Sequence, residues 1–458
     1  MVSVLAAALL LIAAVACSKD ESGPTATSLP EATATALPVT TSTPVASTTT
    51  AVPAATPTTE ASDISPELLA FLLSVDEKMA KIRGTTVAPQ VPFRFLEQSE
   101  LNEWVRSQIS DPEVVEQLRQ ADDVYTLLGI IPADSDLFAD YASLLDAQVL
   151  GAYDAETEEF VVLQVSGSFG PSEEFTYAHE YIHRLQDALF GLDQISERLK
   201  DNSDASLAFT ALVEGDAVTS QQIYALQNMT AQQLAQVVSE AQAALAETPD
   251  VPYILQRTLE FPYAEGARFV DRLRISNGVT AVDAAFARPP ESTEQILHPE
   301  KYFSRELPVV VEIPDSVFGP GWEIIDTDVM GELMVKTWME AIGAGTADST
   351  TAAAGWGGDQ YRVASNEDGQ VAAAIKIAWD TPEQDAAQFY VLLTTMMNIS
   401  PAFERVSIGL ESGVMAFSSA GGVVVVANFG SGPAGQYTAI AAAQDVATAM
   451  PILLAMAE

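Results

Sequence analysis

The residues best suited to chemistry lie in the run His179-Glu180-Tyr181-Ile182-His183. Histidines four positions apart fall on one face of an α-helix, where both imidazoles can reach a single metal ion. An acidic side chain between them can take a proton from water that the metal activates. The chain has 3 histidines, so we interpret this pair as a candidate metal-dependent hydrolytic site. The alternative is that both imidazoles are ordinary surface or core side chains.

A catalytic zinc site needs a third protein ligand, because such sites use three and leave one position open. In the helical pattern of residues 206–226, Glu214 falls within the apolar stripe that contains Ala211 and Val218. An ionised carboxylate there is costly unless a cation or several donors compensate its charge. We therefore expect Glu214 to be the third ligand. An arginine partner, or a carboxylate that extends to solvent, is the alternative.

The element that must position the two histidines is a predicted helix over residues 175–190. Its core stripe contains Ala178, Ile182 and Leu185, and the histidines lie on the flank of that stripe. Ser172 is the expected N-cap, and Gly191 the expected end. A β-hairpin is predicted just upstream, over residues 151–163.

The histidine helix and the following glutamate resemble the gluzincin branch of zincin metallopeptidases. The resemblance is closer still to a group of bacterial and archaeal cell-surface proteins, and it runs from about Asp76 to the C-terminal helix. The shared segments are Gly151–Asp154, His179–Asp187, Ala211–Ala217, His298–Tyr302 and Gly355–Asp359.

This resemblance implies a zinc-dependent peptidase that acts on a peptide or protein substrate. His179, His183 and Glu214 would hold Zn²⁺, and Glu180 would act as the general base. The bound metal would lower the pKa of water and polarise the scissile carbonyl, so that no covalent intermediate is needed.

The sequence departs from many gluzincins at Val218, where an aspartate often supports a zinc-bound histidine. Asp187, one helical turn after His183, and Asp216 are the carboxylates that could take over this role. Such supporting groups fix the tautomer and orientation of a ligand imidazole. Which of the two orients which histidine is open at this point.

The segment around the third histidine offers a further catalytic candidate. We expect His298 or Tyr302 to donate a hydrogen bond to the oxyanion of the tetrahedral intermediate. The alternative is that His298 only stabilises the turn before Pro299.

Residues Phe160–Gln164 resemble the edge strand with which zincins pair an extended substrate. Backbone pairing of this kind gives affinity with little sequence preference. The apolar run over residues 160–163 also fits an interior strand, which is the alternative.

The N-terminal part predicts export and anchoring. The apolar run Val2–Ala16, followed directly by Cys17, resembles a bacterial lipoprotein signal peptide over residues 1–17, with Cys17 as the lipidation site. An ordinary cleaved signal peptide is the alternative. Residues 18–63 are rich in Thr, Pro and Ala and predict a disordered stalk. We therefore expect the protein to be lipid-anchored on the extracytoplasmic face of the membrane.

The remaining chain predicts an α+β fold in two domains. Residues 64–306 are expected to form a mainly helical, zincin-like metallopeptidase domain with a small hairpin and edge strand. Residues 307–458 alternate strand-like runs with helical patterns and are expected to form an α+β domain of unknown role. Helices are predicted there near residues 331–341, 382–396 and 437–457.

Composition restricts the partners. The chain carries 21 Lys+Arg against 63 Asp+Glu, a formal net charge of −42. This charge repels phosphate backbones, so no nucleic-acid partner is expected. The single cysteine excludes an intrachain disulfide and a multi-cysteine metal site.

Two functions are consistent with these patterns. One is a membrane-anchored zinc peptidase. The other is a non-catalytic surface lipoprotein in which zinc is structural and the C-terminal domain binds an envelope partner. Glu180 favours the peptidase, because a structural zinc site needs no general base.

Overall fold

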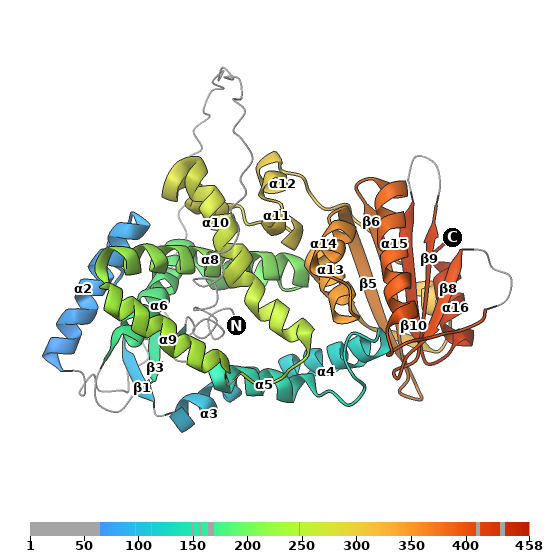
Figure 1. Ribbon diagram of the computed structural model, residues 1–458, viewed down its shortest axis with the longest axis horizontal. Helices are drawn as coiled ribbons and strands as arrows, with labels where there is room; N and C mark the ends of the chain where they lie inside the picture. Colours follow the sequence, from blue (N-terminus) through green and yellow to red (C-terminus); the bar gives the residue numbers. More distant parts are fainter. Residues whose placement is uncertain are drawn as a thin grey trace, which may run out of the picture.

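The computed structural model describes residues 65–96, 98–110, 112–148, 151–154, 157–163, 169–246, 248–408, 413–430 and 436–457. The expected signal peptide with Cys17, and the expected stalk, lie outside these ranges. Within the described part, no helix is both long enough and apolar enough to span a membrane. Helices dominate the N-terminal part, and one large sheet dominates the C-terminal part (Figure 1).

The N-terminal part is built mainly from helices. In chain order they are α2 (Pro66–Arg83), α3 (Gln98–Ile109), α4 (Pro112–Leu127), α5 (Leu137–Gln148), α6 (Pro171–Phe190), α7 (Leu192–Leu199), α8 (Ser203–Asn228), α9 (Ala231–Ala246), α10 (Tyr253–Ala287), α11 (Thr293–Leu297) and α12 (Pro299–Ser304).

Helix α6 begins earlier than the sequence pattern predicts. Gly170, not Ser172, is its N-cap, and Pro171 occupies the first helical position. Proline is favoured there because its missing N–H would have no partner inside the helix. The Glu173 carboxylate accepts a hydrogen bond from the Gly170 N–H at 2.9 Å, which closes the first turn. The helix ends at Gly191, as expected.

A three-stranded sheet lies beside α6. It consists of β1 (Phe93–Leu96), β2 (Gly151–Asp154) and β3 (Glu159–Leu163) in the order β1-β3-β2. The predicted hairpin is confirmed as the antiparallel pair β2–β3. The expectation that the second hairpin strand is an edge strand is wrong, because β3 also pairs in parallel with β1. Phe160 and Val161 are buried, which explains the apolar run.

The C-terminal part contains a seven-stranded antiparallel sheet in the order β4-β5-β6-β10-β9-β8-β7. This sheet and its helices confirm the α+β class. The elements are the 3₁₀ helix η2 (Asp315–Phe318), β4 (Trp322–Asp328), α13 (Gly331–Ala341), α14 (Thr346–Ala353), β5 (Trp356–Asn366), β6 (Val371–Trp379), α15 (Pro382–Ile399), β7 (Glu404–Arg405), β8 (Val414–Ser418), β9 (Val423–Phe429), β10 (Tyr437–Ala443) and α16 (Val446–Ala455).

The predicted helix over residues 437–457 is wrong in its first half, where the chain forms strand β10. This strand lies between β6 and β9. Its side chains alternate between two core clusters, Ile440 and Ala442 on one face and Ala439 and Ala441 on the other. Pairing on both sides and burial on both faces outweigh the helical preference of alanine.

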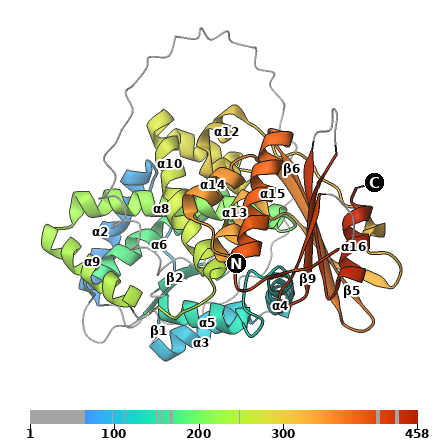
Figure 2. The same cartoon turned by 45° about the vertical axis from the view of Figure 1, so that its right-hand side comes forward.

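Helices cover both faces of the large sheet. Figure 2 shows α15 and α16 on opposite sides of it. Phe389 of α15 belongs to the cluster that contains Ile440, whereas Ile452 of α16 belongs to the cluster that contains Ala441.

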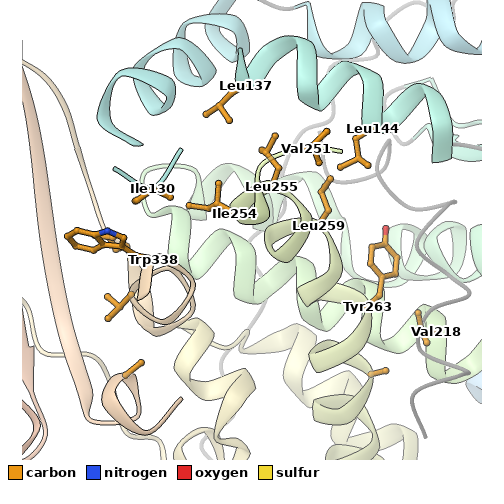
Figure 3. Packing of buried hydrophobic residues seen from close by; sticks show 14 of the residues in the cluster. Ile130, Leu137, Leu144, Val218, Val251, Ile254, Leu255, Leu259, Tyr263 and Trp338 are labelled. Atoms are coloured by element: carbon orange, nitrogen blue, oxygen red, sulfur yellow. The ribbon is translucent and has the colours of Figure 1, made fainter. Parts of the chain in front are cut away.

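The two parts of the chain share one hydrophobic core. Trp338 of α13, which is fully buried, belongs to the same cluster as Ile254 and Leu255 of α10 and Leu137 of α5. Figure 3 shows these side chains between the helices, with Tyr263 and Val218 at the other end of the row. Val218 lies on α8, one turn after Glu214, so this core runs from the candidate site to the sheet.

Candidate metal centre

Three potential metal-ligand atoms converge between α6 and α8. His179 Nε2 lies 3.0 Å from His183 Nε2 and 3.1 Å from Glu214 Oε2. His183 Nε2 lies 3.4 Å from the same carboxylate oxygen. All three side chains are buried. The structure therefore brings together the three residues that the sequence predicts as ligands.

The spacing and chemistry of these donors fit a divalent metal such as zinc. Donors bonded to a tetrahedral zinc at about 2.0–2.2 Å stand roughly 3.3–3.6 Å from one another. Two imidazole nitrogens and a carboxylate oxygen at 3.0–3.4 Å approach these values. Without a cation or proton between them, their lone pairs would repel. Glu214 Oε1 is also buried with no hydrogen-bond partner among the described residues.

The charges of the site couple metal binding to proton release. Burial lowers the pKa of His179 to about 4, which leaves a neutral imidazole able to bind metal. Burial also acts to lower the pKa of His183, but the Glu214 carboxylate outweighs it and raises this pKa to about 9. Burial acts to raise the pKa of Glu214, whereas the charge of His183 lowers it to about 2. The Glu214 carboxylate thus favours a protonated imidazole beside it, and a metal ion that binds these donors would compete with that proton.

Glu180 is held beside this group by the small sheet. Its Oε2 accepts a hydrogen bond from the Tyr153 backbone N–H of β2 at 2.9 Å. Its Oε1 is buried and has no hydrogen-bond partner among the described residues. Burial raises the pKa of Glu180 to about 8. A divalent cation bound beside it would favour the carboxylate, which is the form that accepts a proton.

The expected supporting aspartates contact other groups than the imidazoles. Asp187 accepts a hydrogen bond from the Tyr153 hydroxyl at 3.2 Å. Arg184 donates to the same hydroxyl at 3.2 Å. Asp187 thus supports the tyrosine whose N–H binds Glu180, and no contact among the described residues joins it to a ligand histidine.

The group that contacts a candidate ligand imidazole is Gln186, which the sequence interpretation missed. Its Oε1 lies 3.0 Å from Nδ1 of His183. Its Nε2 donates to Asp216 Oδ2 at 3.1 Å, so Asp216 acts on the histidine only through this amide. The sequence feature that could have indicated this contact is the position of Gln186, three residues after His183 on the same helix face.

His298 and Tyr302 lie at another junction. His298 Nε2 is 2.9 Å from Glu332 Oε1 of α13, and the Tyr302 hydroxyl donates to the Arg288 carbonyl at 3.0 Å. Helix α11 packs against the start of α8 through Thr293 and Asp204. Glu214 is ten residues further along α8, about 15 Å at the rise of a helix. The expected oxyanion role of His298 and Tyr302 therefore has no support in their contacts.

Tyr263 of α10 is an aromatic residue that does contact a candidate ligand, His179. Its ring stacks on that of His179, with centroids 6.3 Å apart. Burial, followed by the charges of Glu214 and Glu180, raises its pKa well above the usual value. The hydroxyl therefore stays protonated and can donate a hydrogen bond.

A close helix crossing places Tyr263 there. A Cβ atom at Gly215 would lie 2.2 Å from the Gly266 carbonyl oxygen, and one at Gly266 would lie 2.1 Å from the Ala211 carbonyl oxygen. Two glycines thus bring α8 and α10 into backbone contact beside Glu214. Small residues that face each other at a crossing are not recognisable as a pair from the sequence of either helix.

Comparison with known proteins gives a family match for the C-terminal part. The family model described as Domain of unknown function (DUF8575) matches residues 322–449, a range that contains all seven strands of the large sheet. No curated protein and no solved structure matches the chain. The family match does not include the metal-ligand candidates.

Proposed function

We propose that this protein is a zinc-dependent peptidase of the zincin type, with His179, His183 and Glu214 as metal ligands. The observation that carries the proposal is the convergence of three buried donor atoms within 3.0–3.4 Å, beside an acidic side chain. A structural zinc site has no use for that fourth group, whereas hydrolysis requires a base.

The chemistry divides between the metal and the chain. Bound zinc would supply Lewis acidity, which polarises the scissile carbonyl and makes water a nucleophile near neutral pH. Glu180 would take the proton from the attacking water and deliver it to the leaving amine. The Tyr263 hydroxyl is a donor suited to the negative charge that develops on the carbonyl oxygen.

The substrate-binding edge in this proposal is β2, since β3 is interior. The N–H of Tyr153 points away from β3, toward Glu180. The outer side of β2 therefore faces the site, and an extended peptide that pairs with it would pass in front of the candidate ligands. Backbone pairing predicts broad sequence tolerance.

The location follows from the N-terminal sequence alone. We propose export, with lipidation at Cys17 as the membrane anchor and residues 18–63 as a stalk. The large negative charge is compatible with a highly solvated surface outside the cell.

Metal content tests the proposal. The purified full-length chain should carry one equivalent of zinc by mass spectrometry, and His179→Ala and Glu214→Ala should each carry little. Glu174→Gln is a matched control, because Glu174 is also buried on α6 but accepts a hydrogen bond from the Tyr224 hydroxyl. Zinc retained by Glu214→Ala would identify a different third ligand. A wild-type chain that takes up no zinc after reconstitution contradicts the proposal.

A further inference from the structure

Gln186 occupies a fully buried position between the two ligand-bearing helices. It lies on α6 one turn after His183. Its Nε2 donates to the Val213 carbonyl oxygen at 2.9 Å and to Asp216 Oδ2 at 3.1 Å. These two acceptors use both hydrogens of the amide.

The environment allows only one orientation of this amide. Rotating it by half a turn would place its oxygen against a carbonyl and a carboxylate, neither of which can donate. Asp216 is kept as an acceptor by Arg83, whose Nε donates to the same Oδ2 at 2.8 Å, and both side chains are buried. Gln186 Oε1 must therefore face His183 Nδ1, at 3.0 Å.

The orientation of the amide in turn selects the tautomer of His183. A carbonyl oxygen can only accept, so Nδ1 of His183 must carry the hydrogen. The neutral imidazole then has its lone pair on Nε2, the atom that lies 3.4 Å from Glu214 Oε2. We propose that Gln186 is the positioning residue of the metal site, fixing His183 in the form that binds metal through Nε2. This inference rests on the metal site of the proposed function.

An amide suits this position better than a carboxylate. The site already contains two buried acidic side chains, Glu180 and the proposed ligand Glu214, and Asp216 adds a third on the far side of Gln186. A further carboxylate could accept from His183 but could not donate to Val213 or Asp216. The amide provides the acceptor without adding negative charge.

Arg83 connects the hydrogen bonds of Gln186 and Asp216 to α2, a helix distant in sequence. It lies at the end of α2, and its Nη1 contacts Asp283 of α10 at 2.7 Å. Its guanidinium also lies over the ring of Phe190 at the end of α6, 5.6 Å from the centroid. The hydrogen bonds from His183 through Gln186 and Asp216 therefore end at a residue that joins α2, α6, α8 and α10.

Zinc affinity of the full-length protein tests this role. Gln186→Met keeps the length of the side chain and removes the acceptor, so affinity measured by competition with a chromophoric chelator should fall about 10–100-fold. Gln221→Met is the matched control. Gln221 is equally buried between the same helices, but it donates a hydrogen bond to the Phe175 carbonyl oxygen, at 2.8 Å. The zinc affinity of the Gln221→Met protein should therefore equal that of wild type.

The outcomes separate this inference from the proposed function. Equal zinc affinity in wild type and Gln186→Met overturns the positioning role and leaves the metal site intact. An equal loss in both glutamine variants assigns the effect to helix packing and also overturns it. A wild-type chain that takes up no zinc removes the metal site itself.

A second measurement needs no variant at Gln186. The chain has 3 histidines, so ¹⁵N-histidine labelling gives a ring spectrum with few signals, and His298→Asn identifies the histidine outside the site. In the zinc-loaded protein, both remaining rings should show metal at Nε2, and the His183 ring should show a hydrogen on Nδ1 that exchanges slowly. A His183 ring protonated on Nε2 contradicts the inference, even if Gln186→Met does not fold.

Discussion

The helical part and the large sheet differ most in what they bury. Within the described strands of the large sheet, Asp359 and Thr438 are the buried polar residues, and alanine and valine fill most other buried positions. The helical part buries many ionisable side chains. Those around the candidate site are Arg83, His179, Glu180, His183, Arg184, Glu214 and Asp216.

This difference indicates where the chemistry lies. Burying ionisable groups is costly unless each is paired or bound to a cation. A protein that only needed a stable core could fill the same space with apolar side chains, as the sheet does. The concentration of buried charge in the helical part therefore supports the proposed metal site there, and in this proposal the sheet is a scaffold that shares its core.

The largest expected effect concerns the base. Glu180→Gln removes the proton acceptor, so peptide hydrolysis should fall about 10²–10⁴-fold while zinc content is unchanged. Glu174→Gln, on the same helix, should hydrolyse like wild type. The assay is cleavage of a peptide library by the metal-loaded variants. Full activity of Glu180→Gln would show that another group accepts the proton.

The next effect concerns the scaffold. Ile440 is fully buried in β10, and Ile440→Ala should lower the free energy of unfolding by about 2–5 kcal/mol through lost burial and a cavity. The zinc affinity of the folded variant should not change, because the sheet contributes no ligand. Urea unfolding and chelator competition measure the two quantities. A large drop in zinc affinity would contradict the division between scaffold and site.

The sequence predicts the candidate ligands better than it predicts the side chains around them. His179 and His183 are recognisable because both lie on one helix, and Glu214 because an acidic residue interrupts an apolar stripe. Gln186 contacts His183 within the same helix, but its role depends on Val213 and Asp216 of another. Such contacts form only when the helices pack together, so the hydrophobic periodicity of one helix does not predict them.

The errors in the fold have the same origin. The alanine-rich segment that forms β10 has a local preference for helix, and its pairing with two neighbouring strands makes it a strand. β3 is interior because β1, more than sixty residues earlier in the chain, pairs with it. Burial on both faces was visible in the apolar run, but the pairing partner was not.

A smaller effect is expected at the crossing of α8 and α10, within the helical part. Gly215→Ala would place a methyl group against the Gly266 carbonyl oxygen, and overpacking of this kind costs about 1–3 kcal/mol. The displaced α10 carries Tyr263, so zinc affinity should fall together with stability, unlike in Ile440→Ala. Gly266→Ala should behave alike, since its methyl group would meet the Ala211 carbonyl oxygen. Unchanged zinc affinity in both variants would show that Tyr263 does not support the ligands.

The smallest effect is a pH dependence of the free energy of unfolding. We expect it from one buried carboxyl group in each region. Burial raises the pKa of Asp76 on α2 to about 6, against a hydrogen bond from the Tyr177 hydroxyl that lowers it. Burial likewise raises the pKa of Asp359 in β5 to about 6, although two backbone N–H groups and the Trp356 indole donate to it.

Between pH 4 and pH 6 the folded protein therefore holds protons on these two groups that the unfolded chain has released. Each group then makes the protein less stable as pH rises through this range, by about 1 kcal/mol per pH unit at most. Asp76→Asn and Asp359→Asn cannot titrate, so urea unfolding of either variant at pH 4, 5 and 6 should show a shallower decline than wild type. A different outcome is that Asp76→Asn alone shows the shallower decline. In that case the three hydrogen bonds to Asp359 outweigh its burial, and the large sheet does not contribute to the loss of stability as pH rises.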